Sequence, residues 1–512
     1  MHTKIFSATT IGVDAHLVEV EVDLSFGMLQ FNIVGLPDAA IKESKQRIHT
    51  ALKNCGIRLP ERKITVNLAP ADLKKEGTLF DLPIALGILH TAEVIMLESD
   101  FLQETLFLGE LSLDGSIKSV RGVLPIACDA LKINKKRLII PQANVHEAAL
   151  LKDIEIIGVA HLIDLIAYLR KEKNIAPMQP HKITSNHLPA SHDIDFNQVK
   201  GQHQAKRALQ IAAAGRHNIL FIGSPGAGKT MLAKRLATIM PPLSFDEMLE
   251  TSKIFSISGK LNDQKLVTQR PFRNPHHTIS QAGLVGGGSF PQPGEISLAH
   301  NGILFLDELT EFKRTTLEVL RQPLENKSVC ISRAQHTLSF PASFLLIAAL
   351  NPCPCGYFGD KKKRCTCSAQ SIANYLSKLS GPLLDRIDLQ IAIPSLEYET
   401  ITSPTHNATS SAQLYEQVHC AVERQKKRFA GTNIWNAFMT TDLIDATCLV
   451  TAGAQILVKK AFERLHLSMR GYHKLLKVAR TIADLENSDT IEEKHIQEAI
   501  MYRSLDQTFE RT

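Results

Sequence analysis

The chain has 512 residues, of which 44% are hydrophobic and 21% are charged. This composition is typical of a globular protein with a substantial core, and it excludes a disordered or low-complexity chain. At roughly 150 residues per domain, the length predicts about three domains. The formal net charge of +6 permits a nucleic-acid partner without requiring one.

The sequence shows neither a membrane span nor a secretion signal. No apolar run reaches the roughly 18 residues that a span requires. The N-terminal segment MHTKIFSATTIGVDAH lacks a basic start followed by an apolar stretch. Nine cysteines are too few for a disulfide scaffold in a chain of this length. We therefore expect a cytoplasmic protein with no membrane partner.

Residues 1–173 alternate strand-like and helix-like segments, which predicts an α/β domain. LVEVEVDLSFG has the period-two pattern of a strand, and AAIKESKQRIHTALKNCG has the pattern of an amphipathic helix. LFLGELSLDGSIKSV predicts two strands joined by the hairpin signal Asp114-Gly115. Residues 174–195 are rich in Pro, His and Ser without periodicity, and we predict a linker there.

The rest of the chain is predicted to form a second α/β unit and a helical unit. The second α/β unit runs from residue 196 to residue 395, and residues 396–411 form a second linker. Residues 412–512 are helical by pattern, in segments such as AQLYEQVHCAVERQKKRF and HKLLKVARTIADLEN.

The second unit contains an apolar strand, a glycine-rich loop and a helix start in the segment NILFIGSPGAGKT (218–230). The loop fits the pattern G-x-x-x-x-G-K-[ST], in which backbone N–H groups and a helix N-terminus bind phosphate oxygens. Lys229 is expected to reach the β- and γ-phosphates of ATP, and Thr230 to bind Mg²⁺ through its hydroxyl. The alternative is a chance glycine-rich turn, and the strand–loop–helix order argues against it. The predicted nucleotide-binding residues are Gly223, Ser224, Pro225, Gly226, Ala227, Gly228, Lys229 and Thr230.

Two further strands end in polar residues that would complete this site. GILFLDE (302–308) ends in Asp307, expected to hold Mg²⁺ through water, and in Glu308, expected to polarise the attacking water as general base. SFLLIAALN ends in Asn351, which can hydrogen-bond the water or the γ-phosphate. The alternatives are a solvated strand end for the acidic pair and a turn asparagine for Asn351.

Four of the nine cysteines are clustered directly after Asn351. Cys353, Cys355, Cys365 and Cys367 form two C-x-C pairs, and four thiolates can close a tetrahedral zinc site. The C-x-C spacing is tighter than the usual C-x₂₋₄-C. We predict structural Zn²⁺, with free cytosolic thiols as the alternative.

Two basic segments are candidate nucleic-acid contacts. One lies between the two cysteine pairs, and the other is near the tip of a hairpin predicted from SVCISRAQHTLSF (328–340). A solvated charged loop is the alternative in each case. The candidate contacts are Arg333, Lys361, Lys362, Lys363 and Arg364.

Five long motifs resemble the ComM/YifB family of magnesium-chelatase-like AAA+ ATPases over nearly the whole chain. They are RPFRNPHHTIS (270–280), LVGGGSFPQPGEISLAHNGILFLDEL (284–309), LNPCPCGYFGD (350–360), GPLLDRIDL (381–389) and LSMRGYHKLLKVARTIADLE (467–486). The resemblance implies an α/β fold with an AAA+ P-loop core and a C-terminal helical lid. It also implies a hexameric ring with ATP at each subunit interface.

The resemblance assigns roles to two arginines. Arg386 would be the arginine finger that acts on a neighbour's γ-phosphate, although by itself it could equally form an ion pair with Asp385 or Asp388. Arg470, at the start of a helix, would be the sensor arginine that reaches the ATP of its own subunit. Arg480 is the rival, but it lies two turns inside the same helix.

Two other features are interpreted as structural. The first domain resembles the Lon-type protease fold in KKEGTLFDLPIALGIL and GELSLDGSIKSVRGVLPIACDAL. Leu79 or Phe80 stands at the serine position and Ala130 at the lysine position of the catalytic dyad. We therefore expect a non-proteolytic scaffold or binding module. His276 and His277 are expected to be structural or pore-lining, and not metal ligands.

The resemblance implies a helicase-like DNA motor that drives branch migration in recombination during natural transformation. The expected cofactors are ATP, Mg²⁺ and structural Zn²⁺, and the expected partners are single-stranded or branched DNA and further copies of the chain. The alternative function is a chelatase-type subunit that remodels a protein partner for metal insertion. The additional N-terminal domain favours the DNA motor.

Overall fold

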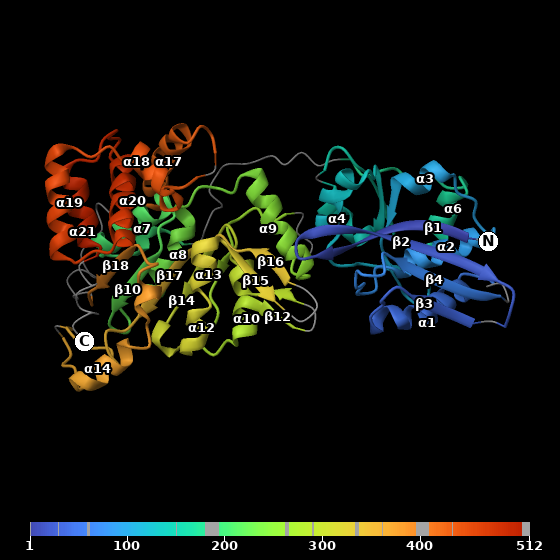
Figure 1. Ribbon diagram of the computed structural model, residues 1–512, viewed down its shortest axis with the longest axis horizontal. Helices are drawn as coiled ribbons and strands as arrows, with labels where there is room; N and C mark the ends of the chain where they lie inside the picture. The colour runs from blue at the N-terminus through green and yellow to red at the C-terminus, as the bar shows by residue number, and fades with distance from the viewer. Residues whose placement is uncertain are drawn as a thin grey trace. The chain divides into compact units, whose positions relative to one another are not determined.

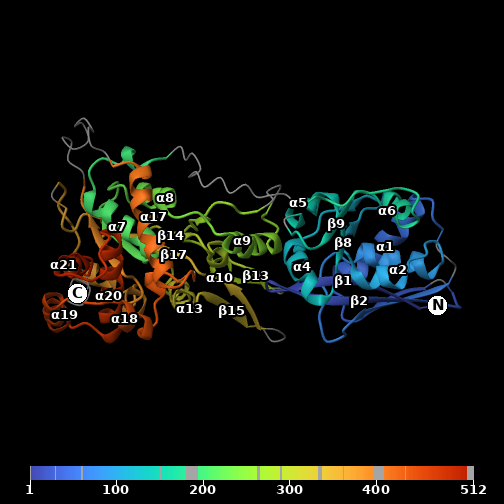
Figure 2. The ribbon, with the colours of Figure 1, turned by 90° about the horizontal axis from the view of Figure 1, so that it is seen from above.

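The computed structural model describes residues 2–28, 30–58, 62–149, 151–179, 194–261, 266–288, 291–332, 337–360, 362–395, 409–432 and 434–503. The chain divides into two compact units, whose elements are labelled in Figures 1 and 2. Unit 1 comprises Met1–Asn186 and Phe245–Val267, and unit 2 comprises His187–Ser244 and Thr268–Thr512. Within the described ranges, no helix combines the length and the apolar character needed to cross a membrane.

Unit 1 is built on a four-stranded sheet in the order β1-β2-β4-β3 and a three-stranded sheet in the order β5-β8-β9. The period-two pattern of β2 is confirmed, because Val18, Val20 and Val22 are buried and alternate with half-buried residues. Helices α1 and α2 pack together on one side of the larger sheet (Figure 2). The hairpin predicted around Asp114-Gly115 is also confirmed, with β6 antiparallel to β7.

The strands of unit 1 are β1 (His2–Ile11), β2 (Asp14–Ser25), β3 (Gln30–Val34), β4 (Lys63–Ala69), β5 (Thr105–Phe107), β6 (Glu110–Leu111), β7 (Ile117–Lys118), β8 (Arg137–Pro141) and β9 (Glu155–Val159). Its helices are α1 (Ala39–Asn54), α2 (Asp81–Thr91), α3 (Ser99–Glu104), α4 (Val123–Ala130), α5 (Val145–Ala148), α6 (Leu162–Leu169) and α9 (Phe245–Ile257).

Helix α9 lies within the predicted ATPase core in the sequence, but it packs as part of unit 1. The Ser256 hydroxyl donates to the buried Glu147 carboxylate at 2.8 Å, and the Gly122 N–H donates to the Ser256 carbonyl at 3.3 Å. The predicted core 196–395 is thus interrupted by a segment that belongs to the other unit. An amphipathic pattern predicts that a helix has an apolar face, but it does not identify the surface on which that face packs.

Unit 2 contains a parallel five-stranded sheet in the order β11-β14-β17-β10-β18. Strands β14 and β17 are buried at every residue, as is expected for continuous apolar strands of a parallel sheet covered on both faces. Because all five strands run in the same direction, their carboxyl ends meet at one edge of the sheet. The hairpin predicted in residues 328–340 is confirmed as β15 and β16, while Arg333 lies outside the described residues.

The strands of unit 2 are β10 (Ile219–Gly223), β11 (Phe272–Arg273), β12 (Gly286–Gly287), β13 (Gln292–Pro293), β14 (Ile303–Leu306), β15 (Ser328–Ser332), β16 (Thr337–Pro341), β17 (Leu345–Leu350) and β18 (Leu389–Ile393). The helices around them are α7 (His203–Gly215), α8 (Lys229–Ile239), α10 (Gln281–Val285), α11 (Glu295–Leu298), α12 (Arg314–Glu318), α13 (Arg321–Asn326), α14 (Ala369–Leu376) and α15 (Gly381–Leu384).

The C-terminal helices form a lid that packs on α7 and α8 (Figure 1). They are α17 (Ser411–Arg428), α18 (Thr441–Thr447), α19 (Ala452–Arg464), α20 (Met469–Leu485) and α21 (Glu493–Met501). The lid and the ATPase core share one hydrophobic cluster, which includes Leu209 of α7, Leu236 of α8 and Leu475 of α20. The predicted helical region is therefore part of unit 2 and not a separate unit.

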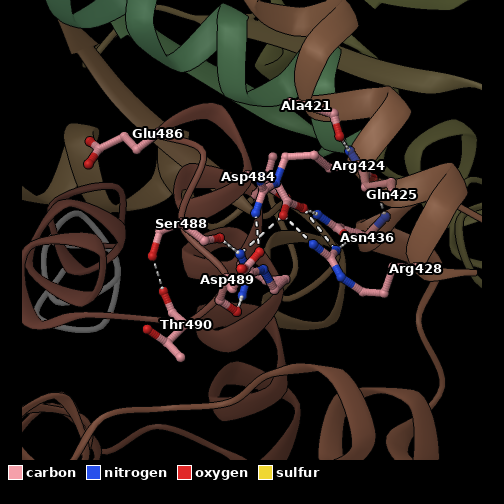
Figure 3. A network of polar contacts seen from close by, with 12 residues as sticks. Ala421, Arg424, Gln425, Arg428, Asn436, Asp484, Glu486, Ser488, Asp489 and Thr490 are labelled. Atoms are coloured by element: carbon pink, nitrogen blue, oxygen red, sulfur yellow. Dashed lines mark hydrogen bonds and ion pairs between the residues drawn. The ribbon is translucent and has the colours of Figure 1, made fainter.

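A buried polar network fixes α20 inside the lid (Figure 3). The fully buried Asp484 carboxylate accepts hydrogen bonds from Arg428 at 2.9 Å and from Asn436 at 2.8 Å. It also accepts from Arg480 at 3.1 Å, and Arg480 donates further to the Asp489 carbonyl at 2.6 Å. Arg480 is fully buried by these contacts, so it is a structural residue of the lid.

Candidate nucleotide-binding site

The glycine-rich loop connects β10 to α8, as the sequence predicts. Gly226 and Gly228 have φ angles of 78° and 91°, in the left-handed region that favours glycine. Gly223 lies so close to β18 that a Cβ atom there would come 2.4 Å from the Ile393 carbonyl oxygen. Helix α8 begins at Lys229, so its first N–H groups and its positive dipole end face the loop.

Lys229 is held at the centre of the loop. Its Nζ donates to the carbonyls of Gly223 at 2.5 Å and Ser224 at 3.1 Å, and to Oδ1 of Asn351 at 2.9 Å. Burial lowers the pKa of the Lys229 ammonium, and the nearby carboxylates of Asp307 and Glu308 oppose that shift. The ends of β10 and β17 therefore meet at one cation, which fits the expected phosphate site.

The expected Mg²⁺ ligands also lie together. Oγ1 of Thr230 donates to Oδ2 of Asp307 at 2.6 Å, which joins the start of α8 to the end of β14. A hydroxyl and a carboxylate are oxygen ligands of the kind that Mg²⁺ prefers, so this donor set fits the ion. Glu308 follows in a left-handed conformation with φ 51°, and its Oε2 lies 3.2 Å from Nδ1 of His277. No sequence pattern predicts a catalytic role for His277, yet it contacts the expected general base.

The four clustered cysteines converge, with all their Sγ atoms within 4.8 Å of one another. Cys353 is buried, and its Sγ accepts a hydrogen bond from the Phe358 N–H at 3.3 Å. Four thiols in one place, stabilised by a backbone N–H donor, form a donor set that fits tetrahedral Zn²⁺. The zinc ion itself stays a prediction.

The cysteine loop (residues 353–367) contacts the phosphate loop directly. Asp360 accepts a hydrogen bond from the Ser224 hydroxyl and from the N–H groups of Lys362 and Lys363. The Ser224 bond is the largest of the effects that lower the pKa of Asp360, to about 2. A Cβ atom on Gly356 would lie 2.6 Å from the Pro225 ring, so the two loops are also in close van der Waals contact.

The candidate nucleic-acid contacts are only partly covered by the described residues. Lys362, Lys363 and Arg364 are exposed on the cysteine loop. Lys363 contacts Tyr357, with its Nζ 4.9 Å from the ring centroid. Lys361, like the hairpin-tip arginine above, lies outside the described residues.

Arg386 and Arg470 lie at the opposite edge of the sheet from the phosphate loop. Arg386 precedes β18, whose first residue Leu389 pairs with Ile219 and whose last pairs with Gly223. Five residues at about 3.3 Å each separate the two edges by roughly 16 Å. Arg386 and Arg470 both donate from Nη2 to the same oxygen, Oε1 of Glu325, at 2.7 Å each.

This placement bears on one expectation and on one alternative from the sequence. Arg470 was expected to reach the ATP of its own subunit, but it lies about one strand length from its own phosphate loop, beside Arg386. Arg386 pairs with Glu325, and not with Asp385 or Asp388, which were its alternative partners. Asp388 instead contacts Lys474 at 2.7 Å. The sequence does not predict these contacts, because the position of α20 depends on how the lid packs on the core.

The positions expected for a protease dyad carry no dyad chemistry in unit 1. Phe80 and Ala130 are fully buried apolar residues, and Leu79 packs partly buried against the core. None of these side chains offers a hydroxyl or an amine.

Comparison with known proteins places this geometry in a family. Family models described as "Magnesium chelatase, subunit ChlI", "Subunit ChlI of Mg-chelatase" and "Magnesium chelatase, subunit ChlI C-terminal" match residues 195–401, 20–144 and 408–503. The chain is 43% identical to competence protein ComM of Haemophilus influenzae, over 98% of this chain and 97% of that protein. It is 41% identical to the uncharacterised protein YifB of Escherichia coli, over 99% of this chain and 97% of that protein. The chain belongs to the ComM/YifB family.

Membership in the ComM/YifB family confirms the predicted fold class. Unit 2 is an AAA+ P-loop core of the magnesium-chelatase type with a C-terminal helical lid, and the family is one of AAA+ ATPases with ATP and Mg²⁺ as the implied ligands. The chain is also 24% identical to Lon protease 2 of Bacillus subtilis over 273 residues, which are 48% of each protein, in agreement with the Lon-like part of the fold.

Proposed function

We propose that this ComM/YifB family member hydrolyses ATP at sites formed between neighbouring copies of the chain in a ring, and that it uses the energy to move DNA. One observation carries the shared site. The phosphate loop lies at the carboxyl edge of the sheet, while Arg386 and Arg470 lie at the amino edge, about a strand length away.

Each residue at the carboxyl edge has a defined role in this proposal. Lys229 and the loop N–H groups bind the β- and γ-phosphates, and Thr230 and Asp307 hold Mg²⁺ when it is bound. Glu308 accepts a proton from the water that attacks the γ-phosphorus, while the bond from that phosphorus to the β–γ bridging oxygen breaks. Asn351 holds Lys229 and is placed to orient the same water.

The two arginines complete the site of a neighbour. A guanidinium stabilises the charge that develops on the transferred phosphoryl group. Arg386 and Arg470 lie at the sheet edge roughly 16 Å from their own phosphate loop, too far to do this for their own ATP. Both guanidinium groups face the same acceptor, so they can engage one phosphate group together. A closed ring, which we propose to be a hexamer, gives every phosphate loop an arginine pair.

We propose that Cys353, Cys355, Cys365 and Cys367 hold one structural Zn²⁺, which stiffens the cysteine loop against the phosphate loop. The Asp360–Ser224 hydrogen bond transmits this stiffness to the nucleotide site. The neighbouring cations Lys362, Lys363 and Arg364 are exposed, and they are the proposed DNA contacts on this loop, together with Lys361 and Arg333.

The DNA role rests on the ComM relative, whose name describes a competence protein. We propose helicase-like branch migration during natural transformation, in the cytoplasm. The test is to measure ATPase activity without DNA and with single-stranded, duplex and branched DNA, together with resolution of a labelled four-way junction. ATP-dependent junction movement supports the proposal. ATPase activity that no DNA changes, together with an immobile junction, would contradict it and favour a chelatase-type role, which the magnesium-chelatase family models suggest.

A further inference from the structure

The cavity in front of Arg386 and Arg470 is unusually rich in cations. It has a volume of about 560 Å³, and its walls come from the ATPase core and from the lid. Six arginine and lysine side chains line it, against the two carboxylates of Glu325 and Asp388. We call it the arginine cavity. An excess of positive charge in a concave site attracts anions.

The two carboxylates of the arginine cavity differ in their partners. Asp388 is already neutralised, because it contacts Lys474 at 2.7 Å and His217 at 3.4 Å and accepts a hydrogen bond from the Asn218 N–H at 3.1 Å. Glu325 faces the arginines. One of its oxygens accepts hydrogen bonds from both Arg386 and Arg470. Glu325 is therefore the anion that these two arginines bind in the isolated chain.

A carboxylate and a terminal phosphate present the same kind of acceptor oxygens to a guanidinium. While Oε1 of Glu325 holds the Nη2 groups of Arg386 and Arg470, those two donors are not available to a phosphate. The Arg470–Glu325 ion pair is weak, because its two side chains are 51% and 41% exposed. The Arg386 side chain is only 13% exposed, but its acceptor Glu325 is the same partly exposed carboxylate. A more highly charged anion can therefore replace Glu325 at both guanidinium groups.

We infer that the arginine cavity accepts the phosphate end of a nucleotide bound to a second copy of the chain, and that Glu325 occupies the phosphate's place until that copy arrives. This inference rests on the shared site proposed above. It makes Glu325 a competing anion that opposes assembly on nucleotide. It differs from a positioning role, in which Glu325 would hold the arginines in their active orientation.

Lys327 gives independent support for an anion at this place. Its Nζ donates to the Leu324 carbonyl at 3.1 Å and lies 4.0 Å from the Phe438 ring centroid. Burial is the main cause that lowers its pKa to about 8; the Asp388 carboxylate opposes this shift, and the surrounding cations add to it. A cation held under these conditions gains a favourable partner when an anion enters the cavity.

The test compares Glu325→Gln with the wild type and with Glu318→Gln. The control is matched, because Glu318 lies on the neighbouring helix α12 and forms one ion pair, with Arg321 at 2.6 Å. Ring formation is followed by sedimentation velocity in ATP and Mg²⁺, with Glu308→Gln added to every chain so that ATP is not consumed. ATPase activity against protein concentration is measured in parallel without that change.

We expect Glu325→Gln to assemble at a protein concentration about 3- to 10-fold lower than the wild type, as the loss of two ion pairs to one partly exposed carboxylate implies. Glu318→Gln should assemble like the wild type. Glu325→Asp keeps the charge on a shorter side chain, so its assembly concentration should lie between those of the wild type and Glu325→Gln. An unchanged or higher assembly concentration for a folded Glu325→Gln chain would overturn the inference.

Arg386→Ala, measured in the same series, distinguishes failure of this inference from failure of the proposed shared ATP site. If Arg386→Ala hydrolyses ATP normally, the shared site is wrong and the inference falls with it. If Arg386→Ala is inactive but Glu325→Gln lowers turnover without easing assembly, the shared site stands and Glu325 is a positioning residue. The inference stands when Arg386→Ala is inactive and Glu325→Gln eases assembly.

Discussion

The buried network around Asp484 allows a sharp prediction about the lid that carries Arg470 (Figure 3). Asp484→Ala removes the carboxylate that pairs with Arg428 and with Arg480, whose side chain is fully buried. Removing one partner of a buried ion pair costs roughly 3–5 kcal/mol, because the other charge remains buried without compensation. For a unit of this size, the melting temperature should fall by on the order of 10 °C.

The single tryptophan provides the assay. Trp435 lies in the lid, is 8% exposed and stacks under Arg216 at 4.5 Å, so its fluorescence reports the lid and not unit 1. Urea titrations followed at this tryptophan give the free energy of unfolding of the lid region. Asp484→Asn, which keeps the shape and loses the charge, should show a smaller loss.

Asp489→Ala is the matched control in the same network. The Asp489 side chain is 95% exposed and pairs with Arg424, while its backbone carbonyl still accepts from Arg480. Asp489→Ala should lower the free energy of unfolding by less than about 1 kcal/mol, as is usual for an exposed ion pair. If the free energies of unfolding of Asp484→Ala and Asp489→Ala differ by less than about 1 kcal/mol, the network does not stabilise the lid as described.

Three further predictions concern the nucleotide site, the metal and the arginine cavity. Lys229→Ala should abolish binding of a fluorescent ATP analogue. Glu308→Gln should still bind the analogue but release no phosphate from ATP, and full turnover by this variant would refute the role of Glu308 as the base. Elemental analysis should find one zinc per chain, and Cys353→Ser should lose the zinc and have a lower ATP turnover. Absence of zinc, together with four thiols that react in the native protein, would rule the site out. The pKa of Lys327 is about 8 in the folded chain and about 10.5 in the unfolded chain. The buried ammonium therefore lowers the free energy of unfolding in full below pH 8, and this destabilisation fades as the pH rises toward about 10.5. Lys327→Met should raise the free energy of unfolding at pH 7 by roughly 1–3 kcal/mol and remove this pH dependence, and an unchanged alkaline profile would show that the lysine is not so perturbed.

The parts of the site that the sequence predicts are those at the ends of apolar strands. Gly223, Asp307 and Asn351 each follow a buried strand, and the carboxyl ends of parallel strands must meet. The glycine-rich loop and the paired cysteines are also local patterns, because their spacing in the chain carries the geometry. The sequence therefore predicts that these residues lie together at one edge of the sheet.

The rest of the site depends on packing between distant segments. Glu325 has no motif around it, and its role follows from two arginines, distant in the sequence, that contact the same carboxylate oxygen. His277 contacts Glu308 because the preceding strand β11 pairs with β14, which no periodicity indicates. The position of Arg470 beside Glu325 is not predicted for the same reason, since the sequence indicates where a helix starts but not which edge of the sheet it faces.

The most direct test of the shared site uses mixtures of two inactive chains. Arg386→Ala keeps the phosphate loop and loses the finger, while Lys229→Ala loses phosphate binding and keeps the finger. Each chain alone should hydrolyse almost no ATP, and mixed rings should regain activity at the interfaces that pair an intact loop with an intact finger. Turnover at the wild-type rate by Arg386→Ala alone would contradict the account.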